Sequence, residues 1–360
     1  QRDRPCQFAG VRSDLDFNVI GDPLMLFCKP SADYLPQPEA CLITGITPEL
    51  ADDRGVIEAE FARRIEYELA RPGTCGVGYN SIRFDDEVTR NLLYRNFYDP
   101  YAREWQNGNS RWDLIDITRA ARALRPDGIE WPLGDDGKPS FRLEALTDAN
   151  GIRHEAAHDA LSDVYATLAL GRLIKQRQPK LYDYLFAHRG KAKALELLKV
   201  GRFTPIVHVS GRFPAHRHCL AVVLPLCLHP KHANEVIAYD LSVDPTPLLE
   251  LDGHAIRERL FVASEQLPEG VERIPLKTVH VNKCPVLAPL SVIRPHDADR
   301  LQIDLPACQQ HLAKIQRATD LMSKLSEVFQ RDYPARETVA VKGLPRGVNV
   351  EISMTAVVDL

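Results

Sequence analysis

The sequence has 360 residues with 44% hydrophobic and 26% charged side chains, and its formal net charge at pH 7 is −4. These are the proportions of ordinary globular proteins, so they exclude disordered, collagen-like and coiled-coil classes. At about 150 residues per domain the length predicts two or three domains, and without any run of about 20 apolar residues we expect no membrane span.

The first 175 residues or so alternate strands with helices. Apolar side chains at Phe61, Ile65 and Leu69 recur every four residues, which is typical of an amphipathic helix. Thr47 and Pro48 offer an N-cap followed by a proline at the first helical position. The predicted elements are two strands joined by a turn within 7–30, a helix from Thr47, a helix over 57–69, a strand over 75–79, and helices over 84–98, 112–124, 141–149 and 158–177. This alternation predicts an α/β domain with a mostly parallel or mixed sheet.

The sequence changes character after Pro179. Short β-branched runs indicate a small β-rich second domain between about 180 and 300. Its predicted strands lie within 205–223, 236–241, 273–281 and 286–293. A helix is predicted over 309–330, and residues 334–360 are predicted to form an irregular tail.

Positive charge is concentrated around the junction of these two parts. Residues 172–217 contain eleven Lys and Arg side chains against two acids, Asp183 and Glu196. Such a stretch can recruit a polyanion by releasing its counterions. A solvated helix face accounts for the pattern equally well.

The eight cysteines are scattered and form no C-x-x-C pair. In a chain of this length they indicate free thiols in a reducing compartment, not a disulfide framework or a zinc ribbon. No secretory signal is visible in the sequence as given, which begins with Gln1. We therefore expect a cytoplasmic protein.

Two clusters of polar residues could carry chemistry. Asp85 lies at a strand-to-helix junction, where α/β sheets usually place their working groups. His158 and Asp163 lie at the start of the long helix predicted over 158–177, close enough in sequence to face one cleft. Taken singly, Asp85 as a helix N-cap and His158 as a surface histidine are the simpler interpretations.

Two other motifs are weak evidence for the functions that they usually indicate. Residues His154 to His158 spell H-E-x-x-H, the helical zinc-protease motif, but Asn150-Gly151 ends the preceding helix and the next apolar period starts after His158. The segment 76–81 is a dinucleotide-binding fingerprint that lacks its third glycine. We weigh both as minor alternatives.

Aromatic and arginine side chains are interleaved with the two clusters. Rings stack on unpaired bases for about 1–3 kcal/mol each, and guanidinium groups bind phosphates through two hydrogen bonds. Because most aromatic residues in any protein belong to its core, each one alone favours a structural role. The set comprises Arg90, Tyr101, Trp105, Arg119, Arg125, Phe141 and Arg142.

Taken together, several motifs resemble a known family. They are Gly78-Tyr79-Asn80 with Phe84-Asp85-Asp86, then the segments 110–114, 139–144, 158–167 and 279–285. In this order they resemble bacterial exonuclease I, a member of the DEDDh superfamily of 3′→5′ exonucleases. The resemblance implies an α/β, RNase H-like exonuclease domain with a mixed sheet over 1–170, lacking its first strand. An SH3-like β-rich domain over 179–333 and a short irregular tail over 334–360 would follow.

The resemblance also implies an activity. Exonuclease I clamps single-stranded DNA and releases 5′-mononucleotides from its 3′ end, in DNA repair and recombination. Asp85 and Asp163 match two of the family's four metal-binding acids, and His158 matches its general base. Phosphodiester hydrolysis of this kind uses two Mg²⁺ ions held by carboxylates, with the base taking a proton from water.

Further residues are carried over as contacts of the DNA strand. They are Arg142 at the substrate, Arg90, Tyr101, Trp105, Arg119 and Phe141 along its path, and Tyr184, Lys191, Asn234, Lys277 and Asn282 in the linker and second domain. The family also implies a partner, the acidic C-terminal tail of single-strand-binding protein, docking near Arg125. We expect a monomer without membrane association.

One departure from the family pattern is serious. The family's first two acids form a D-x-E pair on the opening strand, which should lie just before Gln1. The D-x-E at Asp85-Asp86-Glu87 starts a helix, where positions i and i+2 diverge by about 200°, so it cannot substitute. Two hypotheses follow: a fragment of an active Mg²⁺-dependent exonuclease, or a DNA-binding remnant without hydrolysis. We expect these 360 residues alone to be nearly inactive and to expose a sheet edge.

Overall fold

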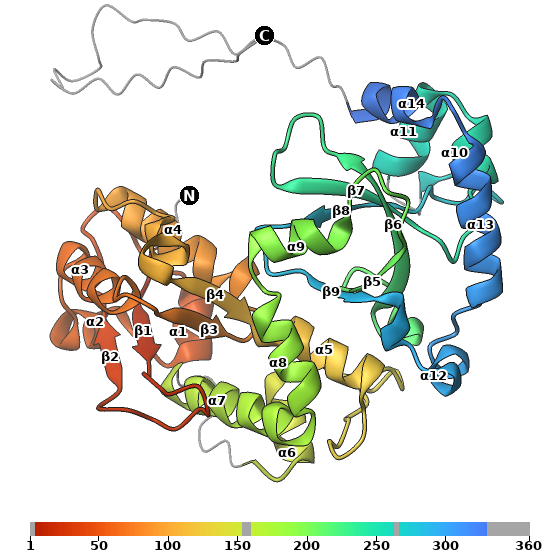
Figure 1. Ribbon diagram of the computed structural model, residues 1–360. Helices are drawn as coiled ribbons and strands as arrows, with labels where there is room; N and C mark the ends of the chain where they lie inside the picture. Colours follow the sequence, from red (N-terminus) through yellow and green to blue (C-terminus); the bar gives the residue numbers. More distant parts are fainter. Residues whose placement is uncertain (1–3, 153–159, 263–265, 330–360) are drawn as a thin grey trace, which may run out of the picture.

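The computed structural model describes residues 4–152, 160–262 and 266–329, which fold into two lobes (Figure 1). The first lobe contains β1–β4 and α1–α7, and the second is built around a five-stranded sheet. None of the described helices is long and apolar enough to cross a membrane. The H-E-x-x-H segment with His158 and the tail predicted over 334–360 lie outside the described residues.

The first two strands form an antiparallel pair, as the sequence predicts. β1 (Gln7–Gly10) pairs with β2 (Leu24–Phe27). The turn between them is held by Asp14, whose carboxylate accepts hydrogen bonds from the backbone N–H groups of Asp16 (2.8 Å) and Asn18 (2.9 Å). This local bond from a short acidic side chain stabilises the turn.

The helices of the first lobe largely follow the predicted pattern. α2 begins at Pro48 because the Thr47 hydroxyl accepts a hydrogen bond from the N–H of Leu50 at 3.1 Å. Phe61 and Ile65 are buried, which confirms the apolar face predicted for α3. The sequence did not predict α1. None of its residues is buried, so it has no apolar face that a periodic pattern could have shown. The helices are α1 (Pro38–Thr44), α2 (Pro48–Arg54), α3 (Glu58–Leu69), α4 (Asp85–Arg95), α5 (Leu114–Leu124), α6 (Leu143–Ala149) and α7 (Ala160–Arg177).

The helix predicted over 112–124 is wrong at its start. Ser110–Asp113 form strand β4, which pairs in parallel with β3 (Cys75–Gly78). α5 begins only at Leu114, because the Asp113 carboxylate caps it by accepting a hydrogen bond from the N–H of Ile115 at 3.1 Å. Buried Trp112 belongs to the strand, but its apolar side chain fits the helical period as well, which hides the boundary.

Parallel and antiparallel pairings both occur in the first lobe, but in two separate sheets. Within the described residues, β1–β2 and β3–β4 are each two-stranded, and no strand joins them. The predicted α/β class is therefore confirmed, while the predicted mixed sheet is divided in this part of the chain.

Two helices, α8 (Pro179–Ala187) and α9 (Lys191–Leu198), lead into the second lobe and carry much of the basic stretch. Several of its cations are bound by the protein itself. Arg189 lies over the Phe186 ring at 3.7 Å, and Arg217 pairs with Asp240 at 2.8 Å. Residues 172–217 therefore do not form one continuous basic helix face.

The second lobe contains a five-stranded antiparallel sheet with the order β8-β7-β6-β5-β9. All residues of β5 and the first seven residues of β6 are buried, so both faces of these strands are covered. The pairing of β6 with β7 shifts between Pro225 and Cys227, because proline has no N–H for the ladder. The strands are β5 (Ile206–Val209), β6 (Leu220–Leu228), β7 (Glu235–Asp240), β8 (Leu276–His280) and β9 (Val286–Pro289).

Helices surround this sheet. They are α10 (Thr246–Glu250), α11 (Gly253–Phe261), α12 (Pro295–Arg300), α13 (Leu305–Arg317) and α14 (Leu321–Phe329). The single helix predicted over 309–330 is wrong, since α13 and α14 are separate. Thr319 and Asp320 lie between them, and these residue types favour helix ends over helix interiors. The short α10, α11 and α12 were missed because few apolar periods fit into them.

One hydrophobic cluster runs through both lobes. It includes Trp112 and Leu124 from the first lobe and Leu220 and Val286 from the second, each no more than 3% exposed. Polar contacts cross the same boundary, among them the hydrogen bond from Arg111 Nη2 to the Asn282 carbonyl at 2.8 Å. The lobes therefore pack against each other through apolar and polar contacts.

Candidate active site

Asp85 is the first residue of α4 and follows β3 after a sharp turn. In this turn Asn80 adopts the left-handed conformation (φ 59°), which asparagine tolerates better than most residues, and Ser81–Arg83 form one turn of 3-10 helix. The Asp85 side chain keeps access to solvent, although protein surrounds it on most sides. The predicted strand-to-helix position of Asp85 is confirmed.

Asp85 and Asp163 act on each other electrostatically. The pKa of Asp85 is raised to about 6, first by burial and then by the negative charges of Asp86, Asp113 and Asp163. Asp163 lies in the first turn of α7, far from α4 in the sequence. The fold therefore brings the two predicted metal ligands close enough for their charges to interact.

Asp113 fixes the turn that leads to Asp85, a role that the sequence reasoning missed. Its carboxylate accepts hydrogen bonds from the N–H groups of Asn80 (2.7 Å) and Ile82 (3.2 Å), besides capping α5. Burial is the largest cause of its raised pKa. An aspartate just before an apolar helical period is the N-cap signal that could have identified it.

The carboxylate oxygens of Asp85 and Asp163 are donors that suit a hard divalent cation. Carboxylate oxygens are the ligands that Mg²⁺ prefers, and a cation between Asp85 and Asp163 would relieve their repulsion. In residues 4–152, 160–262 and 266–329, no group of three or more His, Cys, Asp or Glu side chains could hold a metal ion. The predicted base, His158, lies outside these ranges. Among the described residues, the predicted metal ligands are thus the pair Asp85 and Asp163.

A buried network of charges begins at Asp86, the residue next to Asp85 in the sequence. Asp86 accepts hydrogen bonds from Arg103 at 2.9 Å and from Arg111 at 2.8 Å, one on each carboxylate oxygen. Arg90 binds Glu104 through two bonds of 2.8 and 2.9 Å, and these side chains are 10% exposed or less. The network ties the first turn of α4 to the segment 103–111.

Of the DNA contacts predicted on this side, two aromatic residues are exposed and Arg90 is not. Tyr101 and Trp105 are 54% and 65% exposed, so both rings are available for stacking. Arg90 is 9% exposed, bound to Glu104 and placed over the Tyr101 ring at 5.0 Å. In this conformation Arg90 supports the aromatic side chain and does not face solvent.

Another group of predicted contacts surrounds Phe141. Arg119 lies over its ring at 5.6 Å and pairs with Asp116 at 2.6 Å. Arg142 is 79% exposed, with Glu144 3.8 Å away as a loose partner. A guanidinium group this open can bind a phosphate.

The predicted contacts of the linker and second lobe differ in accessibility. Lys191 and Asn282 are exposed, and Asn234 lies next to the Asn282 loop, since its carbonyl accepts a hydrogen bond from the N–H of Val281 at 2.9 Å. The hydroxyl of Tyr184 is buried without a partner among the described residues, and its ring stacks on His188 at 4.2 Å.

Lys277 is an unusual cation. Its Nζ is buried, has no hydrogen-bond partner in the described part of the chain and lies 3.7 Å from the centre of the Phe213 ring. Burial lowers its pKa to about 7, with Asp116 acting in the opposite direction and Arg212 and Arg83 adding to the decrease.

Arg125, the predicted partner contact, belongs to a different region. It donates to the Val292 carbonyl at 3.3 Å and lies 3.9 Å from Asp297, which also binds Arg294 and Arg300 at 2.7 and 3.0 Å. Asp127 is a second acid that acts on Arg125 and Arg294, so three arginines face two carboxylates and positive charge is in excess here.

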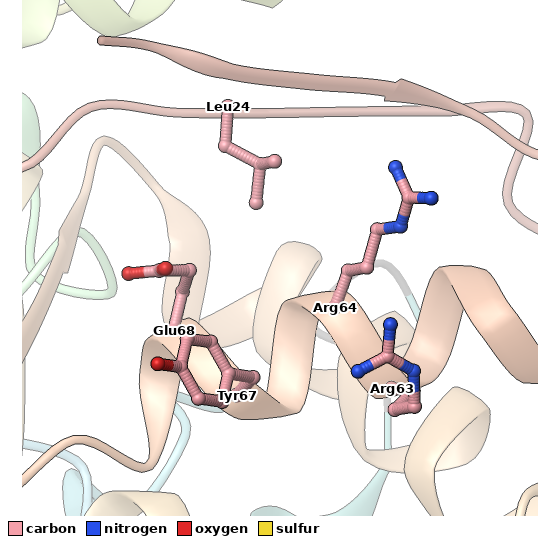
Figure 2. A pocket seen from close by; sticks show the side chains of 5 residues that line it. All are labelled: Leu24, Arg63, Arg64, Tyr67 and Glu68. Atoms are coloured by element: carbon pink, nitrogen blue, oxygen red, sulfur yellow. The ribbon is translucent and has the colours of Figure 1, made fainter.

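Two cavities lie elsewhere on the molecule. One, of about 270 Å³, is lined by Leu24, Arg63, Arg64, Tyr67 and Glu68, and Figure 2 shows these side chains around it. The other, of about 640 Å³, is lined by Lys199, Arg202 and Thr204. Neither includes Asp85 or Asp163, so neither is the candidate active site.

Comparison with protein families defines the class of this protein. A family model described as "Exonuclease" matches residues 1–170, and one described as "Exonuclease I SH3-like domain" matches residues 189–331. An acid-bearing α/β lobe joined to a five-stranded lobe is thus an exonuclease domain followed by an SH3-like domain.

Comparison with individual proteins supports the same class. The chain is 54% identical over 332 residues to exodeoxyribonuclease I of Escherichia coli, which covers 92% of this chain and 70% of that protein. It is similar to the structure of an exonuclease I from Methylocaldum szegediense (TM-score 0.89, 60% identity, 92% of this chain and 70% of the other). It is also similar to a zinc-bound complex of E. coli exonuclease I with single-stranded DNA (TM-score 0.88, 53% identity, 93% and 72%). The chain belongs to the exonuclease I family, as its motifs predict, and is a nuclease by family.

Proposed function

We propose that the protein carrying this chain is a 3′→5′ exonuclease that degrades single-stranded DNA to 5′-mononucleotides by two-metal catalysis with Mg²⁺. The observation that carries this proposal is that Asp85 in α4 and Asp163 in α7 lie close enough for the charge of Asp163 to raise the pKa of Asp85. Tyr101 and Trp105, exposed in the same lobe, offer rings that can stack on bases. The single-stranded DNA bound to E. coli exonuclease I supports the choice of substrate.

The residues of this chain have separate tasks in this proposal. Asp85 and Asp163 hold divalent cations, and Asp113 keeps the turn before Asp85 in place. When bound, two such ions activate a water molecule and stabilise the leaving oxygen. His158 is proposed to take the proton from that water. Tyr101 and Trp105 stack on bases, and Arg142 binds a phosphate near the 3′ end.

A second function applies to the 360 residues as an isolated polypeptide. The described part contains a pair of acids where the family uses four, and no larger group that could hold a metal. We propose that this polypeptide binds single-stranded DNA and hydrolyses it very slowly or not at all.

Cellular roles follow from the same proposal. We propose a cytoplasmic monomer that acts in DNA repair and recombination. The surplus of arginines around Asp297 supports the acidic tail of single-strand-binding protein as a partner at Arg125.

An end-labelling assay tests the proposal. Three proteins are assayed in the presence of Mg²⁺. They are the 360-residue polypeptide, the same polypeptide extended before Gln1 by a strand that carries the D-x-E pair implied by the family pattern, and the extended version with Asp85→Asn. The extended version should release mononucleotides from the 3′ end of single-stranded DNA, and the other two should be slower by about 10³-fold or more. Turnover by the extended version that survives Asp85→Asn, or that starts at the 5′ end, would refute the proposal.

A further inference from the structure

Arg111 joins three elements through its three nitrogen atoms. Nη1 donates to Asp86 Oδ2 at 2.8 Å, Nε lies 3.3 Å from Glu104 Oε2, and Nη2 donates to the Asn282 carbonyl at 2.8 Å. The first two partners belong to the first lobe and the third to the second lobe. Only a planar guanidinium fork can serve all of them at once, since lysine offers a single point charge.

The backbone of the same residue carries a second bond between the lobes. The Cys284 thiol lies 3.1 Å from the Arg111 carbonyl and donates to it. Burial raises the pKa of this thiol to about 12, which keeps it protonated and able to donate. The loop over 281–285 is therefore attached to β4 at one residue by two bonds.

The two ends of this connection are both next to proposed functional residues. Asp86 follows Asp85 in the first turn of α4, and Asn282 is a proposed contact of the DNA strand. Arg111 has a side-chain exposure of 5%, so its bonds are shielded from competing water.

Arg103 provides a comparison within the same network. It binds the other oxygen of Asp86 at 2.9 Å and is equally buried, at 5% exposure. Its second acidic partner, Glu104 at 3.7 Å, also belongs to the first lobe. Arg103 and Arg111 therefore share a carboxylate and a degree of burial, and they differ in the bond to the second lobe.

We propose that Arg111 is a positioning residue that sets the second lobe's strand-binding loop in register with the metal-binding turn of the first lobe. The proposal rests on the proposed function. A strand held by both lobes gains affinity because the second contact forms at high effective concentration, and that gain depends on a fixed distance between the contacts. Removing the Arg111 bonds lowers this gain in affinity without changing the residues by which either lobe contacts DNA.

Binding of oligonucleotides of two lengths tests the proposal. The 360-residue polypeptide and its Arg111→Lys and Arg103→Lys variants are titrated without metal, with strands of about 13 and about four nucleotides. Arg111→Lys should weaken binding of the long strand by roughly three- to tenfold and leave the short strand unchanged. Arg103→Lys should leave the ratio of the two affinities as in the parent. Equal losses for both lengths, or the same change of ratio in Arg103→Lys, would overturn the proposal.

Hydrogen exchange provides a readout that needs no DNA. Arg111→Lys should speed exchange at the amides of 281–285 and of the first turn of α4, whereas Arg103→Lys should affect α4 alone. Cys284→Ala removes only the weaker bond and should speed exchange at 281–285 to a smaller extent. Unchanged exchange at 281–285 in Arg111→Lys would refute the connection itself. A parent polypeptide that binds neither oligonucleotide would refute the proposed function and leave the exchange result to decide on Arg111.

Discussion

The two lobes maintain their structure by different means. Near Asp85 the first lobe has two-stranded sheets and a buried network of Asp86, Arg90, Arg103 and Arg111. The second lobe has a five-stranded sheet whose central strands β5 and β6 are almost entirely apolar and buried. Next to Asp85 the first lobe thus adds compensated charges to its apolar core, whereas the central strands of the second lobe are held mainly by apolar packing.

This difference has a physical reason. Buried Asp86 and Glu104 carry charges, and their paired arginines offset the cost of burying them. The central strands of the second lobe carry few charges, so close apolar packing is sufficient to hold them. The lobes should therefore respond differently to substitution.

The largest effect is expected from Asp86→Ala. Removing this carboxylate leaves Arg103 and Arg111 buried without their shared partner, which should lower the free energy of unfolding by about 3–5 kcal/mol. Urea denaturation measures this change. The matched control is Asp136→Ala, whose 2.9 Å pair with Lys138 is exposed to water and should contribute far less to the free energy of unfolding. Equal costs for the two variants would show that the network contributes little.

A smaller loss is expected in the second lobe from Leu224→Ala. Leu224 is fully buried in β6, and the cavity left by truncation should cost about 2–4 kcal/mol in the same denaturation experiment. Leu228→Ala at the end of the strand, where the side chain is 54% exposed, should cost less than about 1 kcal/mol. A loss at Leu224 no larger than at Leu228 would contradict the apolar account of this lobe.

DNA binding should depend on exposed aromatic side chains of the first lobe. Trp105→Ala should weaken binding of single-stranded DNA by about 1–3 kcal/mol at fixed salt, because one stacked base is lost. Phe97→Ala is the control, since this side chain is 97% exposed but is not a predicted contact. Fluorescence anisotropy with a labelled strand measures both variants. A loss at Phe97 that equals the loss at Trp105 would show non-specific adhesion.

Binding of single-stranded DNA should depend modestly on pH because of Lys277 in the second lobe. Its folded pKa of about 7 lies below its ordinary value of 10.5, so the amine loses its charge as pH rises through 7. Binding of single-stranded DNA should then weaken by about threefold between pH 6 and pH 8, and Lys277→Met should remove this dependence.

The free energy of unfolding should rise with pH between about pH 7 and 10.5, whereas DNA binding weakens as pH rises through 7. Between about pH 7 and 10.5 the unfolded chain binds more protons at this amine than the folded chain does. The contribution of Lys277 to the free energy of unfolding therefore rises with pH across that window. A Lys277→Met variant with the pH profile of the parent in both measurements would contradict the assignment.

The sequence predicts some parts of this molecule better than others. Thr47 and Phe61 mark their helices because a cap and an apolar period are local signals. β4 was missed because Trp112 fits a helical period and its pairing with β3 is a long-range contact. At the candidate site, motifs predict Asp85 and Asp163 as metal ligands. A local N-cap signal could have marked Asp113, but its bonds to Asn80 and Ile82 and the bond of Arg111 to Asn282 join segments distant in the sequence, so no local pattern shows them.

Under the proposed function, Asp85 and Asp163 share a divalent cation. Electron paramagnetic resonance of Mn²⁺ with the 360-residue polypeptide measures this directly. We expect binding on the order of millimolar affinity, lost in Asp85→Asn and in Asp163→Asn, with no further loss in the double variant because both remove the same site. Single variants that bind Mn²⁺ like the parent, or losses that add in the double variant, would contradict a shared ion.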